Sequence, residues 1–204
     1  MSRIKTVLFD IGGVLLTNGW DHRERDVVFS QFNIERAPFE ERHPEANDLW
    51  EKDRITVWEY LDRTLFYTPR DFTPEMFLEA MKAQSLLLPD NALGILRKLA
   101  ASQTVELGCL NNEARELNDY RLEKFGLRQY FQTFFASCYV GLRKPDQAIY
   151  RLALDVLQQA PSEVLFIDDR PENAAAAQEV GLQVVQYKGP GQLESALKQF
   201  DISI

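Results

Sequence analysis

Short apolar runs alternate with helix-like segments through most of the chain, and this alternation restricts its fold more than any other feature. The runs are rich in β-branched or aromatic residues, as strands buried on both faces are. They cover residues 4–9, 104–110, 133–137, 163–167 and 183–187. Helical patterns lie at 113–125, 146–158, 171–180 and 191–199. Strands that alternate with helices form parallel sheets with right-handed crossovers, so the sequence predicts an α/β fold with a Rossmann-like parallel sheet core.

Residues 17–86 interrupt this alternation directly after the first strand. They contain no clear strand pattern, and their helical stretches lie near 22–32, 38–50, 56–66 and 74–85. Thr56-Val57-Trp58-Glu59 is a capping-box pattern, and Thr73-Pro74 is a favourable helix start. We therefore predict an α/β core formed by 1–16 and 87–204, with an inserted α-helical domain at 17–86, called the cap below.

The cap is rich in aromatic residues for its length, and we expect most of them to form its small apolar core. Trp20 is the exception, because it lies near the hinge between core and cap and is a candidate to face a ligand. Closure of such a cap would exclude water from a site beneath it.

Composition and charge exclude several classes of partner. The net charge of −8 argues against a nucleic-acid partner, because binding to a phosphate backbone requires a basic patch. No apolar stretch has the length of a membrane span, so we expect no membrane partner. Cys109 and Cys138 belong to no framework of cysteine pairs, which favours reduced thiols and a cytoplasmic location. Nothing in the sequence indicates an oligomeric state.

Polar residues stand at the carboxyl ends of the predicted strands, where open parallel sheets bind their ligands. They are Asp10, the pair Asn111 and Asn112, Lys144, and the pair Asp168 and Asp169. Each has a structural alternative when it is taken alone: an aspartate before glycines can cap a turn, asparagine often begins a helix, and a lysine can be solvated. Two adjacent acids at a strand end are harder to explain, because they repel each other unless a cation lies beside them.

The polar residues gain a common explanation when they are taken together. A divalent metal nearly neutralises the carboxylates of Asp10, Asp168 and Asp169, and Lys144 completes the charge balance. Hard oxygen ligands of this kind suit Mg²⁺, which commonly binds through few carboxylates together with a substrate phosphate. In such a site Asp10 is close enough to attack phosphorus, which predicts a route through an aspartyl-phosphate.

The same residues, in the same order, resemble the haloacid dehalogenase-like hydrolase superfamily. Asp10 in FDIGGVLL looks like the nucleophile motif, Lys144 in GLRKPD like the family lysine, and Asp168-Asp169 in FIDDRPENAAAA like the metal-binding acidic motif. Asn111 in CLNN falls where the family usually has a Ser or Thr that binds the phosphoryl group. The cap lies where the family has its type-1 cap.

The resemblance implies a Mg²⁺-dependent phosphatase that acts on a small phosphorylated metabolite. We accordingly assign the candidate residues to three roles. They are Asp10 and Lys144 for catalysis, Asn111 and Asn112 for substrate binding, and Asp10, Asp168, Asp169 and the backbone carbonyl of Gly12 for Mg²⁺.

Gly12 departs from the family pattern, in which phosphatases mostly carry a second aspartate two residues after the nucleophile as general acid and base. A positioned acid or base is typically worth about 10²–10⁴-fold in rate. Its absence leaves three solutions: a leaving group that departs unaided, an acid from the cap, or slow catalysis with solvent. The cap candidates are Asp21, His22 and Glu24, although a histidine in DHRERD is also typical of a solvated helix start.

Two other functions are compatible with a missing second acid. The superfamily contains haloacid dehalogenases, which need no proton donor because halide leaves without a proton, but the resemblance gives them no metal and no paired acids. Alternatively, the chain is a catalytically weak or silent protein that still binds phosphate.

Overall fold

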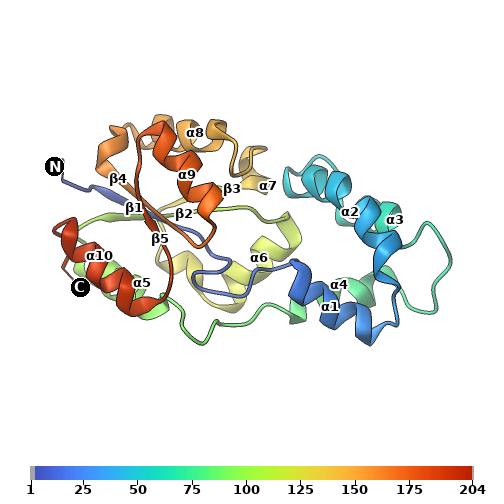
Figure 1. Cartoon of the computed structure of the whole chain (residues 1–204). Coiled ribbons are helices and arrows are strands. Elements are labelled where there is room, and N and C mark those ends of the chain that lie inside the picture. Colours follow the sequence, from blue (N-terminus) through green and yellow to red (C-terminus); the bar gives the residue numbers. More distant parts are fainter. Residues whose placement is uncertain (1–2, 204) are drawn as a thin grey trace.

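The computed structural model, which describes residues 3–203, contains a five-stranded parallel sheet covered by helices on both faces (Figure 1). The strands are β1 (Thr6–Phe9), β2 (Glu106–Asn111), β3 (Thr133–Ala136), β4 (Val164–Asp168) and β5 (Gln183–Gln186). Their order in the sheet is β3-β2-β1-β4-β5, so β1 lies in the centre. All four neighbouring pairs are parallel, which confirms the predicted Rossmann-like α/β fold.

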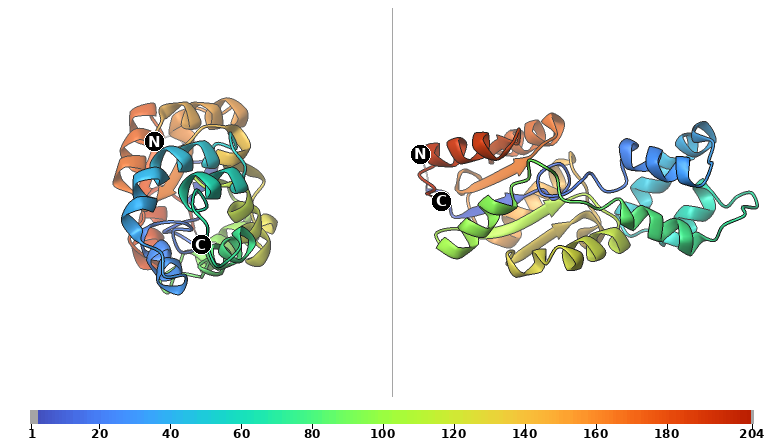
Figure 2. Two further views of the ribbon diagram at one scale, coloured as in Figure 1. Left: turned by 90° about the vertical axis from the view of Figure 1, so that its right-hand side faces the viewer. Right: turned by 90° about the horizontal axis from the view of Figure 1, so that it is seen from below.

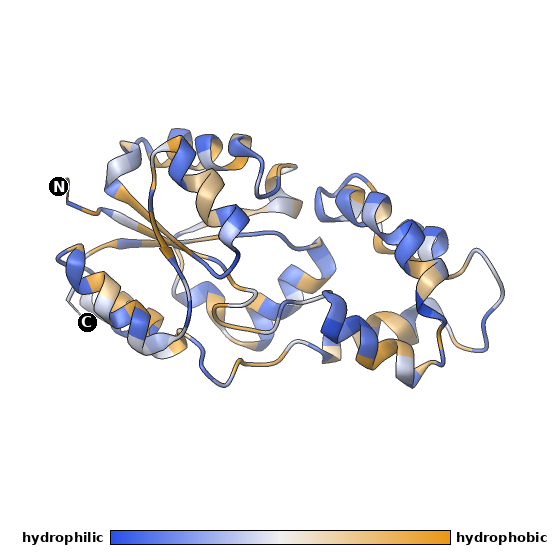
Figure 3. Cartoon of the chain, in the orientation of Figure 1, coloured by the Kyte–Doolittle hydropathy of each residue, from blue (hydrophilic) through white to orange (hydrophobic). Residues whose placement is uncertain are grey.

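Alternating side chains of the central strands enter two apolar clusters. Val7 and Phe9 of β1 belong to the cluster beneath α5 (Leu93–Ser102) and α10 (Pro190–Gln199), whereas Leu8 belongs to the cluster beneath α8 (Gln147–Leu157) and α9 (Pro171–Val180). This arrangement follows from the two-residue period of a strand. Figure 3 shows the resulting apolar sheet between helices with polar outer faces. Between residues 3 and 203, no helix combines the length and apolar character needed to cross a membrane.

One helix of the core, α5, was absent from the predicted elements. It has no side-chain cap at its first turn, where the cap residue is Ala92, so the usual start signal is missing. The side chain of Asn91 instead accepts a hydrogen bond from the Leu93 backbone N–H at 3.0 Å. The remaining core helices are α6 (Arg115–Lys124) and the short α7 (Ser137–Val140).

Four helices lie between β1 and α5, joined to the core by two stretches of chain that run side by side (Figure 2). They are α1 (His22–Gln31), α2 (Arg36–Glu51), α3 (Val57–Thr64) and α4 (Pro74–Ala83). The predicted capping box begins α3, where the Thr56 hydroxyl accepts from the Glu59 N–H and the Glu59 carboxylate accepts from the Thr56 N–H. The division of the chain into domains at 17 and 86 stays a prediction.

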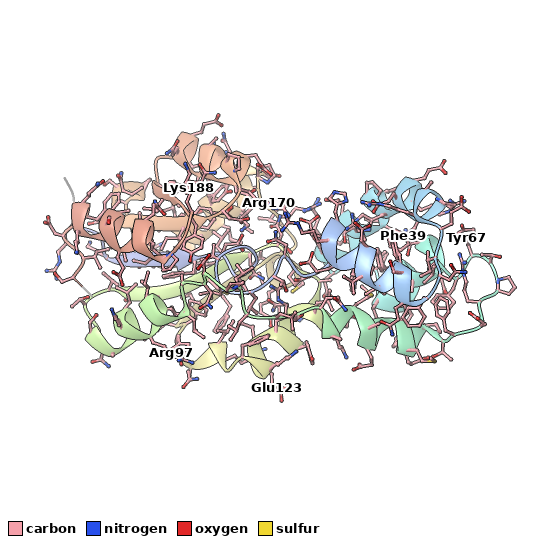
Figure 4. The ribbon with its side chains drawn as sticks, turned by 60° about the horizontal axis from the view of Figure 1, so that its bottom comes forward. Phe39, Tyr67, Arg97, Glu123, Arg170 and Lys188 are labelled. Atoms are coloured by element: carbon pink, nitrogen blue, oxygen red, sulfur yellow. The ribbon has the colours of Figure 1, made fainter. Side chains whose placement is uncertain are left out.

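The cap helices share an apolar cluster of their own, to which α6 contributes Ala114, next to its first residue, and Leu117. Trp20 stands in its middle, with its ring perpendicular to three phenylalanine rings, and its indole N–H donates to the Tyr60 hydroxyl at 2.7 Å. Trp20 is therefore mainly a packing residue. Figure 4 shows Phe39 inside this cluster and Tyr67, which is exposed, at the outer end of the cap.

A buried polar chain continues from Tyr60 to His43 and Arg25. The Tyr60 hydroxyl lies 2.8 Å from His43 Nδ1, and Arg25 Nη1 lies 3.2 Å from His43 Nε2. Because a guanidinium only donates, His43 must be neutral and accept at Nε2. Burial, followed by the charge of Arg25, lowers the pKa of His43 to about 3.

His43 is expected to make the cap sensitive to acid. The unfolded histidine takes up a proton near pH 6.5 but the folded one only near pH 3, so this contribution to stability is complete above pH 6.5 and is lost as the pH falls. The slope is at most about 1.4 kcal/mol per pH unit. Urea unfolding between pH 7 and 4, followed by tryptophan fluorescence, measures it, and His43→Gln should show a shallower decline. Equal declines in the two proteins would contradict this account.

Candidate active site

The candidate site lies at the carboxyl ends of β1 and β4, the neighbouring strands at which the chain changes direction across the sheet. The last register pair of these strands is Phe9 with Ile167, so Asp10 and Asp168 come next on adjacent strands. The Asp10 N–H donates to the Ile167 carbonyl at 2.8 Å, which fixes the backbone of the aspartate. Ligands of open α/β sheets bind at such a switch point.

Lys144 stands between these two carboxylates. Its ammonium nitrogen lies 2.9 Å from Asp10 Oδ2 and 2.6 Å from Asp168 Oδ2. Burial alone would lower the pKa of Lys144, but the charges of Asp10 and Asp168 outweigh it and raise the pKa. The lysine is therefore charged at neutral pH, although only 2% of it is exposed.

Asp168 is the most strongly stabilised anion of the group. Burial opposes its charge, but Lys144 and hydrogen bonds from the Arg170 backbone N–H and the Asn173 amide give it a lowered pKa. Asn173 projects from the first turn of α9, so the helix that follows β4 supplies part of the carboxylate's hydrogen bonding. Asp168 therefore stays ionised next to Lys144.

Asp10 has the opposite tendency. Its Oδ1 accepts from the Ile11 N–H at 2.8 Å, and its Oδ2 faces Lys144. Burial, which Lys144 only partly offsets, and repulsion from the other two carboxylates raise the pKa of Asp10 to about 8. Further positive charge beside Asp10 would favour its anionic form.

The three aspartates offer a set of ligands for a hard cation. One carboxylate oxygen from each of Asp10, Asp168 and Asp169 lies within 4.8 Å of the others. Among residues 3–203, Asp169 Oδ1 is buried without a hydrogen-bond partner. Burial, followed by the charge of Asp168, raises the pKa of Asp169. A divalent cation would give that orphaned oxygen a partner and balance the anionic excess, so these residues fit Mg²⁺.

The two asparagines occupy different positions. The side chain of Asn112 holds the backbone of Lys144 in place. Its Nδ2 donates to the Lys144 carbonyl and its Oδ1 accepts from the Lys144 N–H, both at 2.8 Å. Asn112 also lines the cavity described next. Asn111 is buried, and its amide donates to Asn118 Oδ1 at 3.1 Å. Binding of substrate by either residue stays a prediction.

A cavity of about 370 Å³ lies between the sheet edge and the cap. Its core side includes Asp10, Gly12, Asn112, Lys144 and Arg170, and Figure 4 shows Arg170 on the side of the core that faces the cap. The cap side includes Trp20, Asp21, His22, Arg25, Glu40 and His43. Most of these side chains are charged or polar.

The cap residues considered as proton donors differ in their contacts. Asp21 Oδ2 accepts from Arg170 Nη2 at 2.6 Å, which bridges cap and core. His22 lines the cavity, and its Nδ1 faces two guanidinium groups, Arg25 Nη2 at 2.9 Å and Arg36 Nη2 at 3.1 Å. Glu24 is not among the residues that line the cavity.

Several residues that line the cavity were not selected from the sequence. Glu113 and Arg121 form a buried ion pair beside the hinge, and burial raises the pKa of Glu113 to about 7 although Arg121 opposes this. Their spacing of eight residues carries no recognisable signal. Asn18 also lines the cavity, and in the sequence it is an ordinary asparagine next to glycine.

Comparison with known proteins gives a family match over most of the chain. A family model described as haloacid dehalogenase-like hydrolase matches residues 4–181. A flavin mononucleotide hydrolase of Arabidopsis thaliana is 32% identical over 163 residues, which cover 80% of this chain and 65% of that protein. A sesquiterpene phosphatase of Aspergillus oryzae is 26% identical over 201 residues, which cover 87% of each.

A solved structure has the same fold. It is a HAD family enzyme of Bacteroides thetaiotaomicron in complex with magnesium and inorganic phosphate, with a TM-score of 0.72 and 23% identity. The superposition covers 91% of this chain and 95% of that chain. At this identity the likeness shows the fold alone.

Gly13 is expected to be required for the position of Asp169. Its φ is +70°, and a Cβ atom there would overlap the Asp169 carboxylate. Gly13→Ala should therefore lower the free energy of unfolding by about 1–3 kcal/mol, measured by urea denaturation. Gly94→Ala is the control, because a Cβ atom there meets no atom of residues 3–203 within 4 Å, and it should stabilise α5 by about 0.5–1 kcal/mol. Parent-like stability of Gly13→Ala would refute the close approach.

Proposed function

Because the chain belongs to the haloacid dehalogenase-like hydrolases, we propose that it is a Mg²⁺-dependent phosphatase of a small phosphorylated metabolite. The observation that carries this proposal is the meeting of Asp10, Asp168, Asp169 and Lys144 at one sheet edge. Two relatives are named as a flavin mononucleotide hydrolase and a sesquiterpene phosphatase, and a protein of the same fold binds magnesium and phosphate. The chain spans 65% of the length of the flavin mononucleotide hydrolase, so we do not assign the full activity of that protein to this chain.

Asp10 is the nucleophile of this proposal. A carboxylate oxygen of Asp10 attacks phosphorus, an O–P bond forms, and the ester P–O bond breaks with its electron pair going to the leaving oxygen. Water then attacks phosphorus, the bond to Asp10 breaks, and inorganic phosphate and free carboxylate result. The net reaction consumes one water molecule and releases an alcohol.

Lys144 serves this chemistry by position and charge. Its ammonium donates to Asp10 Oδ2 and Asp168 Oδ2, so it holds the nucleophile against β4 and favours its anionic form. Asn112 fixes the lysine through both backbone groups of that residue. A fixed cation at a site of developing negative charge needs no reorganisation during the reaction.

Asp10, Asp168, Asp169 and the carbonyl of Gly12 would hold the Mg²⁺. When it is bound, the ion neutralises phosphoryl oxygens and so makes phosphorus easier to attack. Asn111 and Asn112 are proposed to bind the phosphoryl group from the adjacent strand end. The orphaned oxygen of Asp169 supports the metal assignment.

The cavity wall limits the class of substrate. Its cap side is dominated by Asp21, His22, Arg25, Glu40 and His43, so a polar leaving group suits it better than an apolar one. We propose that the cap, residues 17–86, forms the roof over this group. The cytoplasmic location expected from two free, buried cysteines stays part of the proposal.

Asp10→Asn is expected to abolish turnover without unfolding the chain. The amide keeps the size of the carboxylate but is a poor nucleophile and removes one anionic ligand. Phosphate release from an aryl phosphate, with Mg²⁺ and with EDTA, should fall below about 10⁻³ of the parent rate in the variant and in the EDTA sample. Circular dichroism checks the fold. Retained activity of Asp10→Asn would remove Asp10 from the nucleophile role.

The missing acid at Gly12 is expected to make the enzyme selective for good leaving groups. With no side chain at position 12 to donate a proton, an aryl phosphate should exceed an alkyl phosphate in kcat/KM by about 10²–10⁴-fold. Both esters are measured under the same Mg²⁺ concentration. Equal values would contradict the expectation, whereas halide release from a 2-haloacid without metal would indicate a dehalogenase.

A further inference from the structure

The space beside Gly12 borders on Thr17 and Asn18. They belong to residues 10–21, which join β1 to α1 and are called the linker below; positions 17–21 also fall inside the predicted cap. A Cβ atom built on Gly12 would lie 3.3 Å from Asn18 Oδ1, 3.4 Å from Asn18 Cα and 3.7 Å from the Thr17 carbonyl. A Cβ atom at position 12 would therefore be in tight contact with Asn18, whose side chain would have to shift by a few tenths of an ångström. Position 12 carries no acidic side chain, and the polar group next to it is the carboxamide of Asn18.

The linker presents Asn18 from a fixed backbone. The Thr17 carbonyl accepts from Arg121 Nη2 at 2.5 Å, and the Thr17 hydroxyl donates to the Gln84 carbonyl at 2.8 Å. On the other side, Gly19 has a φ of +71°, and a Cβ atom there would overlap the ion pair of Glu113 and Arg121. The residues on both sides of Asn18 are thus held in place, Thr17 by Arg121 and Gln84, and Gly19 by its close approach to Glu113 and Arg121.

The side chain of Asn18 is open to the cavity. It lines the same cavity as Asp10 and Gly12. Within residues 3–203 its carboxamide takes part in no hydrogen bond, although its linker neighbours do. A carboxamide offers two N–H donors and one acceptor, so a bound ligand can use groups that the protein leaves free.

We propose that Asn18 contacts the leaving-group oxygen of the substrate. This inference rests on the proposed phosphatase function. When the ester P–O bond breaks, its electron pair places negative charge on the leaving oxygen, and an N–H of Asn18 donates a hydrogen bond to it. The amide keeps its protons, so the departing oxygen takes its proton from water.

The role of Asn18 explains how a site without an acid can still assist departure. A fixed neutral donor at a developing oxyanion is typically worth about 10²–10³-fold in kcat, and it acts without a change of protonation. Its value grows with the charge on the leaving oxygen, which is largest for alcohols of high pKa. Asn18 should therefore matter most for poor leaving groups.

The test measures kcat/KM for a series of phosphate monoesters with leaving groups of graded pKa, in the holoenzyme with Mg²⁺. Asn18→Ala should lose about 10²–10³-fold for an alkyl phosphate and much less for the best aryl phosphate. The dependence of kcat/KM on leaving-group pKa should therefore be steeper in Asn18→Ala than in the parent. Asn18→Gln, which keeps the carboxamide, should recover part of the alkyl loss.

Asn33→Gly is the matched control, because it removes an exposed carboxamide from a position with φ of +50° outside the cavity. Asn33→Gly should leave kcat/KM unchanged for every ester of the series. A uniform loss in Asn18→Ala across all leaving groups, or no loss, would overturn the role of Asn18 while leaving the phosphatase intact. Absence of turnover in the parent would instead refute the proposed function.

A second measurement tests the geometry independently. Gly12→Asp is introduced into the parent and into Asn18→Ala, with Gly94→Asp as the control for added charge on an open position. Tight contact between the two side chains predicts that the effect of Gly12→Asp on kcat/KM differs between the two backgrounds by about 2- to 100-fold. The same factor in both backgrounds would contradict the contact between positions 12 and 18.

Discussion

The site depends on one buried cation, Lys144, held between Asp10 and Asp168 at the ends of two adjacent strands. Two carboxylates so deeply buried and so close cannot both ionise without it. Even with this lysine the charge balance is incomplete, because Asp169 adds a third carboxylate, one oxygen of which has no partner in the part of the chain that the structure describes. The remaining anionic excess is what makes a divalent cation the natural partner of the site.

The surrounding structure serves this charge balance. The side chain of Asn112 binds the backbone N–H and carbonyl of Lys144, and Gly13 has no Cβ that would displace Asp169. In the sequence 157 residues lie between Asp10 and Asp168. The crossovers of the sheet place β1 next to β4 and so bring the two side chains together. Above them, the ion pair of Asp21 with Arg170 connects the cap to the same sheet edge. Fold and site are therefore stabilised by the same contacts.

Apolar strand runs and strand-end residues were enough to predict the parallel sheet and to select Asp10, Lys144, Asp168 and Asp169, because both signals are local. The first helix after the cap, α5, was missed because Ala92 gives no capping signal. Asn18 and the pair of Glu113 with Arg121 were missed for another reason. Their place in the cavity depends on how the linker folds back over the core, and no spacing in the sequence encodes that contact.

The most direct test of Asp10 as the nucleophile is to find the covalent intermediate. The Mg²⁺-loaded protein is mixed with an aryl phosphate, quenched in acid during turnover, and its peptides are analysed by mass spectrometry. We expect the mass of one phosphoryl group on the peptide that contains Asp10, and its absence in Asp10→Asn. Turnover without such a peptide, or a phosphoryl group on Asp168 or Asp169, would contradict it.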